Sequence, residues 1–110
     1  MDLLPLDLAE VLYRLSGELD ALYGDRYKGL LLYGSYARGE AHEGSDVDLL
    51  LLLEGPVDPV EEILYLEPAK WPISLESGYV LSILPASTDD YRKAEDPLLW
   101  NARREGISTA

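Results

Sequence analysis

The stretch LLLYGSYARGEAHEGSDVDLLLLLEG, residues 30–55, decides how this chain folds. The short apolar run at 29–34, ended by glycine, is typical of a buried strand. The second run, at 46–54, has the continuous apolar character of a strand that is buried on both faces. Between them lies a segment rich in glycine, serine and charged residues. Asp46 and Asp48 stand at the start of the second run, where a buried strand would prefer apolar residues. These two acids need a functional explanation as well as a structural one.

The sequence around this stretch predicts helices packed on a mixed sheet. Apolar residues at three- and four-residue steps from Leu4 to Leu22 predict an amphipathic helix that stops at Gly24. A short helix is expected directly after Gly34, over 35–41. The other expected elements are a helix over 59–69 that ends before Pro68, two strands at 72–76 and 78–86 joined as a hairpin at Ser77–Gly78, and a helix after residue 87 that Pro97 interrupts. This order predicts an α/β or α+β fold.

The composition limits the choice of partner and compartment. The 110 residues suit one compact domain over 1–110. Nine Lys and Arg against 21 Asp and Glu give a net charge of −12, which disfavours stable binding of free DNA or RNA and favours a basic protein partner. The chain has no cysteine, its N-terminus lacks the basic segment of a signal peptide, and its longest apolar run, 49–53, is too short to span a bilayer. We therefore expect a cytoplasmic protein without membrane contact.

The two acids have the spacing of a metal site. Residues two positions apart on a strand point to the same face, so the Asp46 and Asp48 carboxylates would lie about 7 Å apart along the chain. They repel each other unless a cation lies between them. Carboxylate oxygens suit Mg²⁺, and paired divalent ions about 3.5–4 Å apart use such an arrangement. The simpler alternative is a surface pair that caps the start of the strand.

The segment after the first strand has the features of a phosphate site. Gly34 lets the backbone approach a ligand closely, and a helix that begins there would direct free N–H groups at phosphate. Ser35 adds a hydroxyl, and Arg38 adds a fork of donors one turn later. Ser45, beside Asp46, could orient that acid or touch phosphate. The alternatives are an ordinary turn at Gly34 and Ser35, a surface cation at Arg38 and a local loop cap at Ser45.

Together these residues resemble a known family. The segment GSYARGEAHEGSDVDL, residues 34–49, is similar to the minimal nucleotidyltransferases of the DNA polymerase β-like superfamily. Their pattern is Gly-Ser, about ten residues, and Asp-x-Asp beside an apolar residue, and here ten residues separate Ser35 from Asp46. The resemblance implies the nucleotidyltransferase fold and the transfer of a nucleoside monophosphate, AMP from ATP, to a hydroxyl. It also implies that the two aspartates are catalytic ligands of two Mg²⁺ ions, and that the nucleotide-binding residues are Gly34, Ser35, Arg38 and Ser45.

The same resemblance implies a protein partner and exposes one departure. Small domains of this type are often paired with helical HEPN-type toxins, which implies an antitoxin that adenylylates its toxin. Active members usually carry a third carboxylate on a later strand, where this chain has Val80, and the nearest acid is Glu76 before the expected turn. Two interpretations therefore stay open: an enzyme, and a degenerate fold that binds a nucleotide or a partner without transfer. Aminoglycoside nucleotidyltransferases share the motif but carry additional helices, and template-directed polymerases carry basic duplex-binding regions.

Overall fold

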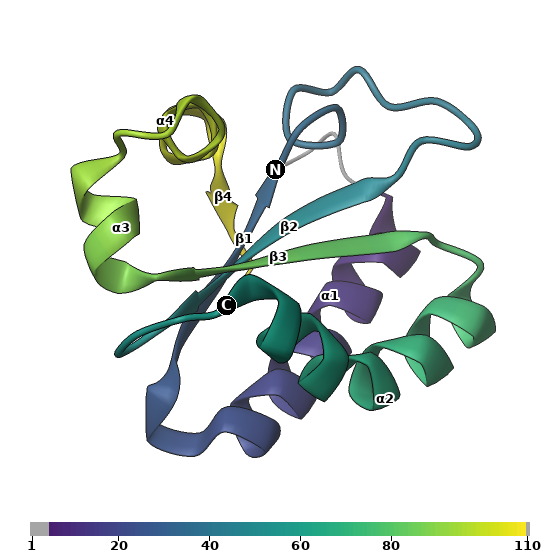
Figure 1. Cartoon of the computed structure of the whole chain (residues 1–110). Helices are drawn as coiled ribbons and strands as arrows, with labels where there is room; N and C mark the ends of the chain where they lie inside the picture. The colour runs from purple at the N-terminus through teal and green to yellow at the C-terminus, as the bar shows by residue number, and fades with distance from the viewer. Residues whose placement is uncertain (1–4, 110) are drawn as a thin grey trace.

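A computed structural model describes residues 5–109 and contains a mixed sheet with helices on both faces (Figure 1). The sheet has four strands in the order β3-β2-β1-β4. The central strands β1 (Tyr27–Tyr33) and β2 (Val47–Leu53) are antiparallel. β3 (Leu81–Ser87) runs parallel to β2, and the short β4 (Ile107–Ser108) pairs with the other edge of β1. The expected mixed α/β fold is confirmed.

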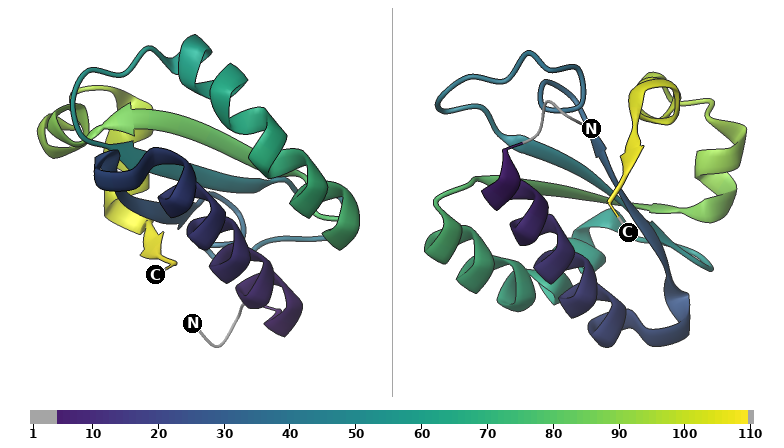
Figure 2. Two further views of the ribbon diagram at one scale, coloured as in Figure 1. Left: turned by 90° about the horizontal axis from the view of Figure 1, so that it is seen from below. Right: turned by 180° about the vertical axis from the view of Figure 1, so that it is seen from behind.

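The helices lie in two groups. α1 (Leu6–Tyr23) and α2 (Pro59–Ser77) cover one face of the sheet, and α3 (Thr88–Lys93) and α4 (Pro97–Glu105) lie against the other (Figure 2). A short 3₁₀ helix, η1 (Gly24–Arg26), connects α1 to β1. The predicted break at Pro97 is therefore present. Leu4, which we placed on the first helix, lies outside the described residues.

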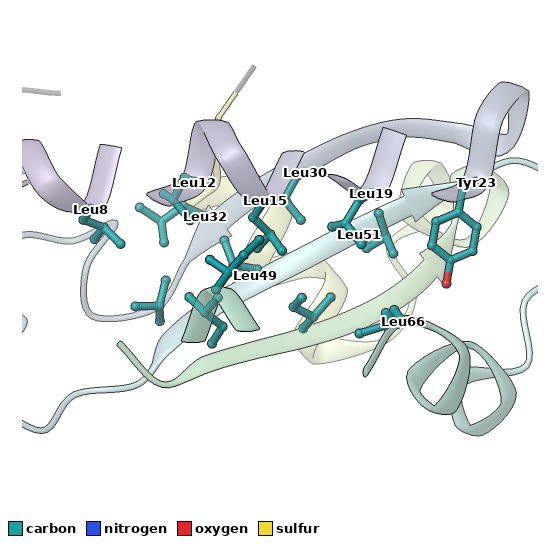
Figure 3. Close-up of a cluster of buried hydrophobic side chains, with 14 of the residues drawn as sticks. Leu8, Leu12, Leu15, Leu19, Tyr23, Leu30, Leu32, Leu49, Leu51 and Leu66 are labelled. Carbon is teal, nitrogen blue, oxygen red and sulfur yellow. The ribbon is translucent and has the colours of Figure 1, made fainter. Parts of the chain in front are cut away.

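The larger core forms between α1, α2 and the sheet (Figure 3). The three- and four-residue spacing predicted for α1 places its buried side chains on one face of the helix. These side chains are Leu8, Leu12, Leu15, Leu19 and Tyr23. They pack against leucines of β1 and β2, and Leu66 and Ile73 of α2 close the same cluster.

The leucine run of β2 is buried on both sides. Leu49 and Leu51 join the cluster under α1 and α2, whereas Leu50 packs with Ala86 and Ala102 on the face that α3 and α4 cover. Because side chains alternate along a strand, Asp48 shares the face of Leu50. The acid at the start of β2 therefore faces the side of the sheet on which α4 lies.

The predicted strand at 72–76 and its hairpin at Ser77–Gly78 are wrong. α2 continues through Pro68 and Pro72 as far as Ser77, and Gly78 then caps it in the left-handed conformation, with φ 80°. The Gly78 N–H donates to the Ser74 carbonyl at 3.0 Å. Both prolines face solvent, so the hydrogen bonds that they remove lie on the outer side of the helix, while its inner side stays packed.

The helix expected over 35–41 is also wrong, because this segment forms a series of turns. The Arg38 N–H donates to the Gly34 carbonyl at 3.1 Å, and the Glu40 N–H reaches back to the Ser35 carbonyl at 2.9 Å. Gly39 has a positive φ of 72°, which ends any helical path.

Within 5–109, no helix is both long and apolar enough to cross a membrane.

The two interior prolines generate a stability prediction. An interior proline destabilises a helix by about 3 kcal/mol. Replacing it with alanine removes this cost but also lets the unfolded chain become more flexible, which lowers stability by about 0.4–1 kcal/mol. Pro68→Ala should therefore raise the free energy of unfolding by up to about 2 kcal/mol in chemical denaturation. Pro59→Ala, at the first turn of α2, is the control and should change it little. A destabilised Pro68→Ala protein would show that packing of the curved helix needs the proline.

Candidate active site

The ends of β1 and β2 bring Gly34 and Asp48 together. Tyr33 is the register partner of Asp48 across the antiparallel ladder, and Gly34 follows with φ 77°, a conformation that favours glycine. A methyl group added to Gly34 would overlap the Asp48 carboxylate. Glycine at this position therefore lets the acid lie directly against the backbone.

A carboxylate from another part of the chain accepts the hydrogen bonds of the donors that lie beside Gly34 and Asp48. Glu105, the last residue of α4, accepts the Gly34 N–H at 3.0 Å and the Arg38 Nη1–H at 3.1 Å through the same oxygen, Oε1. The Arg38 Nε–H donates to Glu40 at 2.8 Å. A backbone N–H and a guanidinium thus converge on one anionic oxygen, next to Asp48. Donors arranged in this way can bind a phosphate oxygen equally well.

Negative charge is concentrated around Asp48. Burial raises the pKa of the Asp48 carboxyl, and the charge of Asp46 raises it further. Arg38 lowers this pKa, whereas Glu105 raises it. Burial also raises the pKa of Tyr33, with Asp48 and Glu105 adding to the effect. A bound cation would relieve this repulsion and would favour the ionised form of Asp48.

The other residues predicted for the site lie around this centre. Asp46 is exposed, two residues before Asp48. Ser35 is half-buried in the turn that follows Gly34. The Ser45 hydroxyl accepts a hydrogen bond from the His42 N–H at 3.0 Å. This contact is the local loop cap that the sequence offered as the alternative to a phosphate contact. The structure therefore gathers the glycine, the arginine and both acids, and gives Ser45 a contact within its own loop.

The third carboxylate is absent from the strand beside Asp48. Ser82 is the direct register partner of Asp48 on β3, and the Val80 carbonyl accepts the Val47 N–H at 2.8 Å just before that strand. Neither residue is acidic. Glu76 pairs with Arg14 of α1 at 2.9 Å, on the opposite side of the sheet, so it takes no part in this arrangement.

Glu105 is the residue that the sequence did not reveal. It is 71 positions from Gly34 in the sequence. α4 brings it to the site because Ala102 and Leu99 pack on the face of the sheet opposite α1 and α2. Its side chain is only 18% exposed. One signal was present: an acid in the last turn of a helix opposes the helix dipole and so costs free energy unless it has a separate use.

The acids fit a magnesium ion that is shared with a phosphate ligand. Among residues 5–109 there is no cluster of three or more His, Cys, Asp or Glu side chains suited to enclose a metal. Mg²⁺ is usually held by one or two carboxylates together with substrate phosphates, and Asp46 and Asp48 supply two carboxylates beside an anion-binding turn. The donor set therefore fits a metal–polyphosphate complex better than a metal bound by protein alone.

Comparison with known proteins assigns the family. Residues 12–90 match the nucleotidyltransferase domain family. The chain belongs to this family. The match runs from α1 to the start of α3, so it contains Gly34, Asp46, Asp48 and the whole of β3. The resemblance recognised in residues 34–49 is confirmed at the level of the family.

Two curated relatives of this nucleotidyltransferase domain share sequence with it. A Methanocaldococcus jannaschii protein named "Putative protein adenylyltransferase" is 33% identical over 49 residues, covering 44% of this chain and 50% of the relative. A bifunctional uridylyltransferase/uridylyl-removing enzyme of Pseudomonas syringae is 46% identical over 54 residues, covering 44% of this chain and 6% of the relative. The chain thus matches half of one relative's length and a small part of the other's.

A solved structure shares the fold. A crystal structure of a toxin–antitoxin with AMP-PNP superposes with a TM-score of 0.54 at 18% identity, covering 86% of this chain and 72% of the other. At this identity the similarity establishes a common fold for the nucleotidyltransferase domain.

Gly34 provides a sharp test of the close approach to Asp48. Gly34→Ala should cost about 1–2 kcal/mol for its positive φ and should also displace the Asp48 carboxylate, which weakens Mg²⁺ binding. Gly44→Ala is the matched control, because Gly44 has φ 89° and open space around it, so only the backbone cost applies. Chemical denaturation and Mn²⁺ titration followed by paramagnetic relaxation measure the two effects. Equal metal affinities in the two variants would contradict the account.

The raised pKa of Asp48 predicts how stability depends on pH. The folded protein holds this proton more tightly than the unfolded chain, whose carboxyl has a pKa near 3.8. The stabilisation that results is complete below that value and is lost as the pH rises through the folded-state pKa. At pH 7, Asp48→Asn should therefore raise the Tm, and the gain should vanish toward pH 3–4.

Exposed Asp25 in η1 supplies the control, because Asp25→Asn should leave the Tm nearly unchanged at pH 7. Thermal melts across pH 3–8 test the prediction, and a lower Tm for Asp48→Asn at neutral pH would refute it.

Proposed function

We propose that this domain is a Mg²⁺-dependent nucleotidyltransferase that transfers AMP from ATP to a hydroxyl of a protein partner. The observation that carries the proposal is the convergence of the Gly34 N–H and the Arg38 guanidinium on one anionic oxygen beside Asp48. The relative named as a protein adenylyltransferase and the fold shared with a toxin–antitoxin solved with AMP-PNP support this choice of nucleotide and acceptor.

Each residue has a role set by its place. Asp46 and Asp48 would hold Mg²⁺, which neutralises the charge on the triphosphate and polarises the phosphorus under attack. The Gly34 N–H, the Ser35 hydroxyl and Arg38 would bind the outer phosphates, with Ser45 supporting the loop that carries Asp46. The acceptor oxygen forms a bond to the α-phosphorus, and the bond to pyrophosphate breaks. The acceptor's proton would pass to solvent, because neither Val80 nor Ser82 offers a carboxylate to take it, and turnover should therefore be slow.

When no nucleotide is bound, Glu105 would occupy the hydrogen-bond donors that we assign to the phosphates. Its carboxylate uses the same Gly34 N–H and Arg38 Nη1–H that we assign to the triphosphate, so the two anions compete. Glu105 lies near enough to Asp48 to raise its pKa, and this repulsion favours its departure. Nucleotide binding would therefore require the end of α4 to release its carboxylate.

The partner is proposed to be a HEPN-type helical toxin in the cytoplasm. The net charge of −12 suits a basic protein and repels nucleic acid. The fold is shared with a protein solved as part of a toxin–antitoxin, which favours an antitoxin role.

Intact-mass measurement tests the transfer. The domain is incubated with a purified HEPN-type helical toxin, Mg²⁺ and each nucleoside triphosphate in turn. We expect the toxin to gain the mass of one AMP with ATP, and Asp46→Asn or Asp48→Asn to slow this by about 100-fold or more. Asp89→Asn, an exposed acid on α3, is the control and should react like the wild type. Transfer that survives both active-site substitutions would disprove the assignment.

A second candidate function is a binding module without transfer. It is favoured by Val80 and Ser82, which leave the strand beside Asp48 without an acid. In that case Asp46→Asn and Asp48→Asn would neutralise the toxin as well as the wild type does, and no mass would be gained.

Competition by Glu105 predicts a gain of affinity. Glu105→Ala should bind a non-hydrolysable ATP analogue roughly 3- to 10-fold more tightly, because no carboxylate has to leave the Gly34 N–H and Arg38 before the phosphates can bind. Glu40→Ala removes the other carboxylate on Arg38 but leaves the Gly34 N–H occupied, so its affinity should change less. Isothermal titration with Mg²⁺ measures both variants. If Glu105→Ala instead leaves affinity unchanged and abolishes transfer, Glu105 is the missing third carboxylate.

A further inference from the structure

α2 carries apolar side chains on two opposite faces. Leu66 and Ile73 point inward and are buried against the sheet. The other face carries four exposed apolar residues, which we call the α2 stripe. These are Val60, Leu64, Trp71 and Leu75, with exposed fractions of 69%, 70%, 50% and 75%.

The α2 stripe lies along one side of the helix. Its members follow each other at steps of four and seven residues, which is the repeat that keeps side chains on one side of a helix. At about 1.5 Å per residue the stripe extends over about 22 Å. A helix that is apolar on both sides is normally covered on both, and contiguous exposed apolar residues mark interaction sites.

One part of the α2 stripe is held in position. Lys70 pairs with Glu67 at 3.0 Å, and its Nζ lies 4.9 Å from the centre of the Trp71 ring. These contacts restrict the indole before any partner arrives, so less conformational entropy is lost on binding. A large, pre-positioned aromatic residue is typical of the centre of a protein interface.

The charges beside the α2 stripe indicate what can cover it. Glu61 is exposed on one side of the apolar line, Glu67 lies on the other side in its pair with Lys70, and the chain as a whole carries −12. An anionic membrane, a nucleic acid or a second copy of the chain would bring like charge against Glu61 and against the acidic surface as a whole. A protein with Lys and Arg beside its apolar residues would instead gain favourable pairs.

We propose that the α2 stripe docks a partner protein through a helix whose apolar ridge is bordered by Lys and Arg. Two helices pack with their axes 8–10 Å apart and their side chains interdigitated, and the straight stripe suits such packing. α2 lies on the outside of the molecule beside α1, away from α3 and α4 (Figures 1 and 2). Asp48 faces the other side of the sheet, so docking here does not require the transfer reaction.

The test uses designed helical peptides as probes. One peptide of about five turns carries a leucine ridge with Lys and Arg on both flanks, and its control carries the same leucines with Glu flanks. Fluorescence anisotropy should show wild type binding the basic peptide at least tenfold more tightly than the acidic one, with affinity falling as salt rises. Leu64→Gln/Leu75→Gln should weaken binding at least tenfold, and Glu61→Lys should reduce the preference for the basic peptide.

Leu6→Gln is the matched control, because Leu6 is 85% exposed but lies on α1, outside the α2 stripe. Its affinity should stay within about twofold of the wild type. All substitutions are at exposed positions, and circular dichroism verifies that each variant is folded.

Four outcomes would overturn the proposal. The first two are equal binding of both peptides and binding of neither. The third is binding to phosphatidylcholine or phosphatidylserine vesicles that is lost in Leu64→Gln/Leu75→Gln. The fourth is a wild-type dimer in sedimentation that this double variant converts to monomer. The last two would assign the α2 stripe to a membrane or to a second copy of the chain. Because binding is measured without nucleotide, failure here leaves the transfer reaction untouched, and the reverse also holds.

Discussion

The arrangement of the site depends on one close contact, the Asp48 carboxylate lying against the backbone of Gly34. The antiparallel register of β1 and β2 places the two residues side by side, and only the missing side chain of glycine leaves room for the acid. The positive φ of Gly34 then turns the chain so that its own N–H and the guanidinium of Arg38 converge on one anionic oxygen. A binding site for negative charge is thereby built directly beside a concentration of negative charge, and a metal ion with a polyphosphate would satisfy both.

The same strand explains why the core and the site can adjoin. Leu49 and Leu51 face α1 and α2, while Leu50 faces α4, so β2 needs apolar residues at every interior position. The acids stand only where the strand begins, where Asp46 is exposed and Asp48 is partly exposed. Burial still raises the pKa of Asp48, which means that the fold gives up some stability at neutral pH to keep this carboxylate in place.

Local sequence patterns predicted what local physics controls. The two buried strands, the amphipathic α1 and the break at Pro97 follow from periodicity and backbone chemistry, and the Gly-Ser and Asp-x-Asp spacing indicated the family. The course of α2 through Pro68 and Pro72 was missed because packing on its inner face outweighs two lost hydrogen bonds on its outer face. Glu105 and the short β4 were missed because their partners are distant in sequence, so no local pattern records them.

We propose that a triphosphate replaces the Glu105 carboxylate at the Gly34 N–H. The backbone amide resonance of Gly34 in a ¹⁵N-labelled sample reports this exchange directly. On addition of Mg²⁺ and a non-hydrolysable ATP analogue, this resonance should shift strongly and saturably, together with the side-chain Nη–H resonances of Arg38, which donate to Glu105 in the unliganded protein. A saturable shift of other amides that leaves Gly34 and Arg38 unmoved would show that the nucleotide binds elsewhere and would contradict the account.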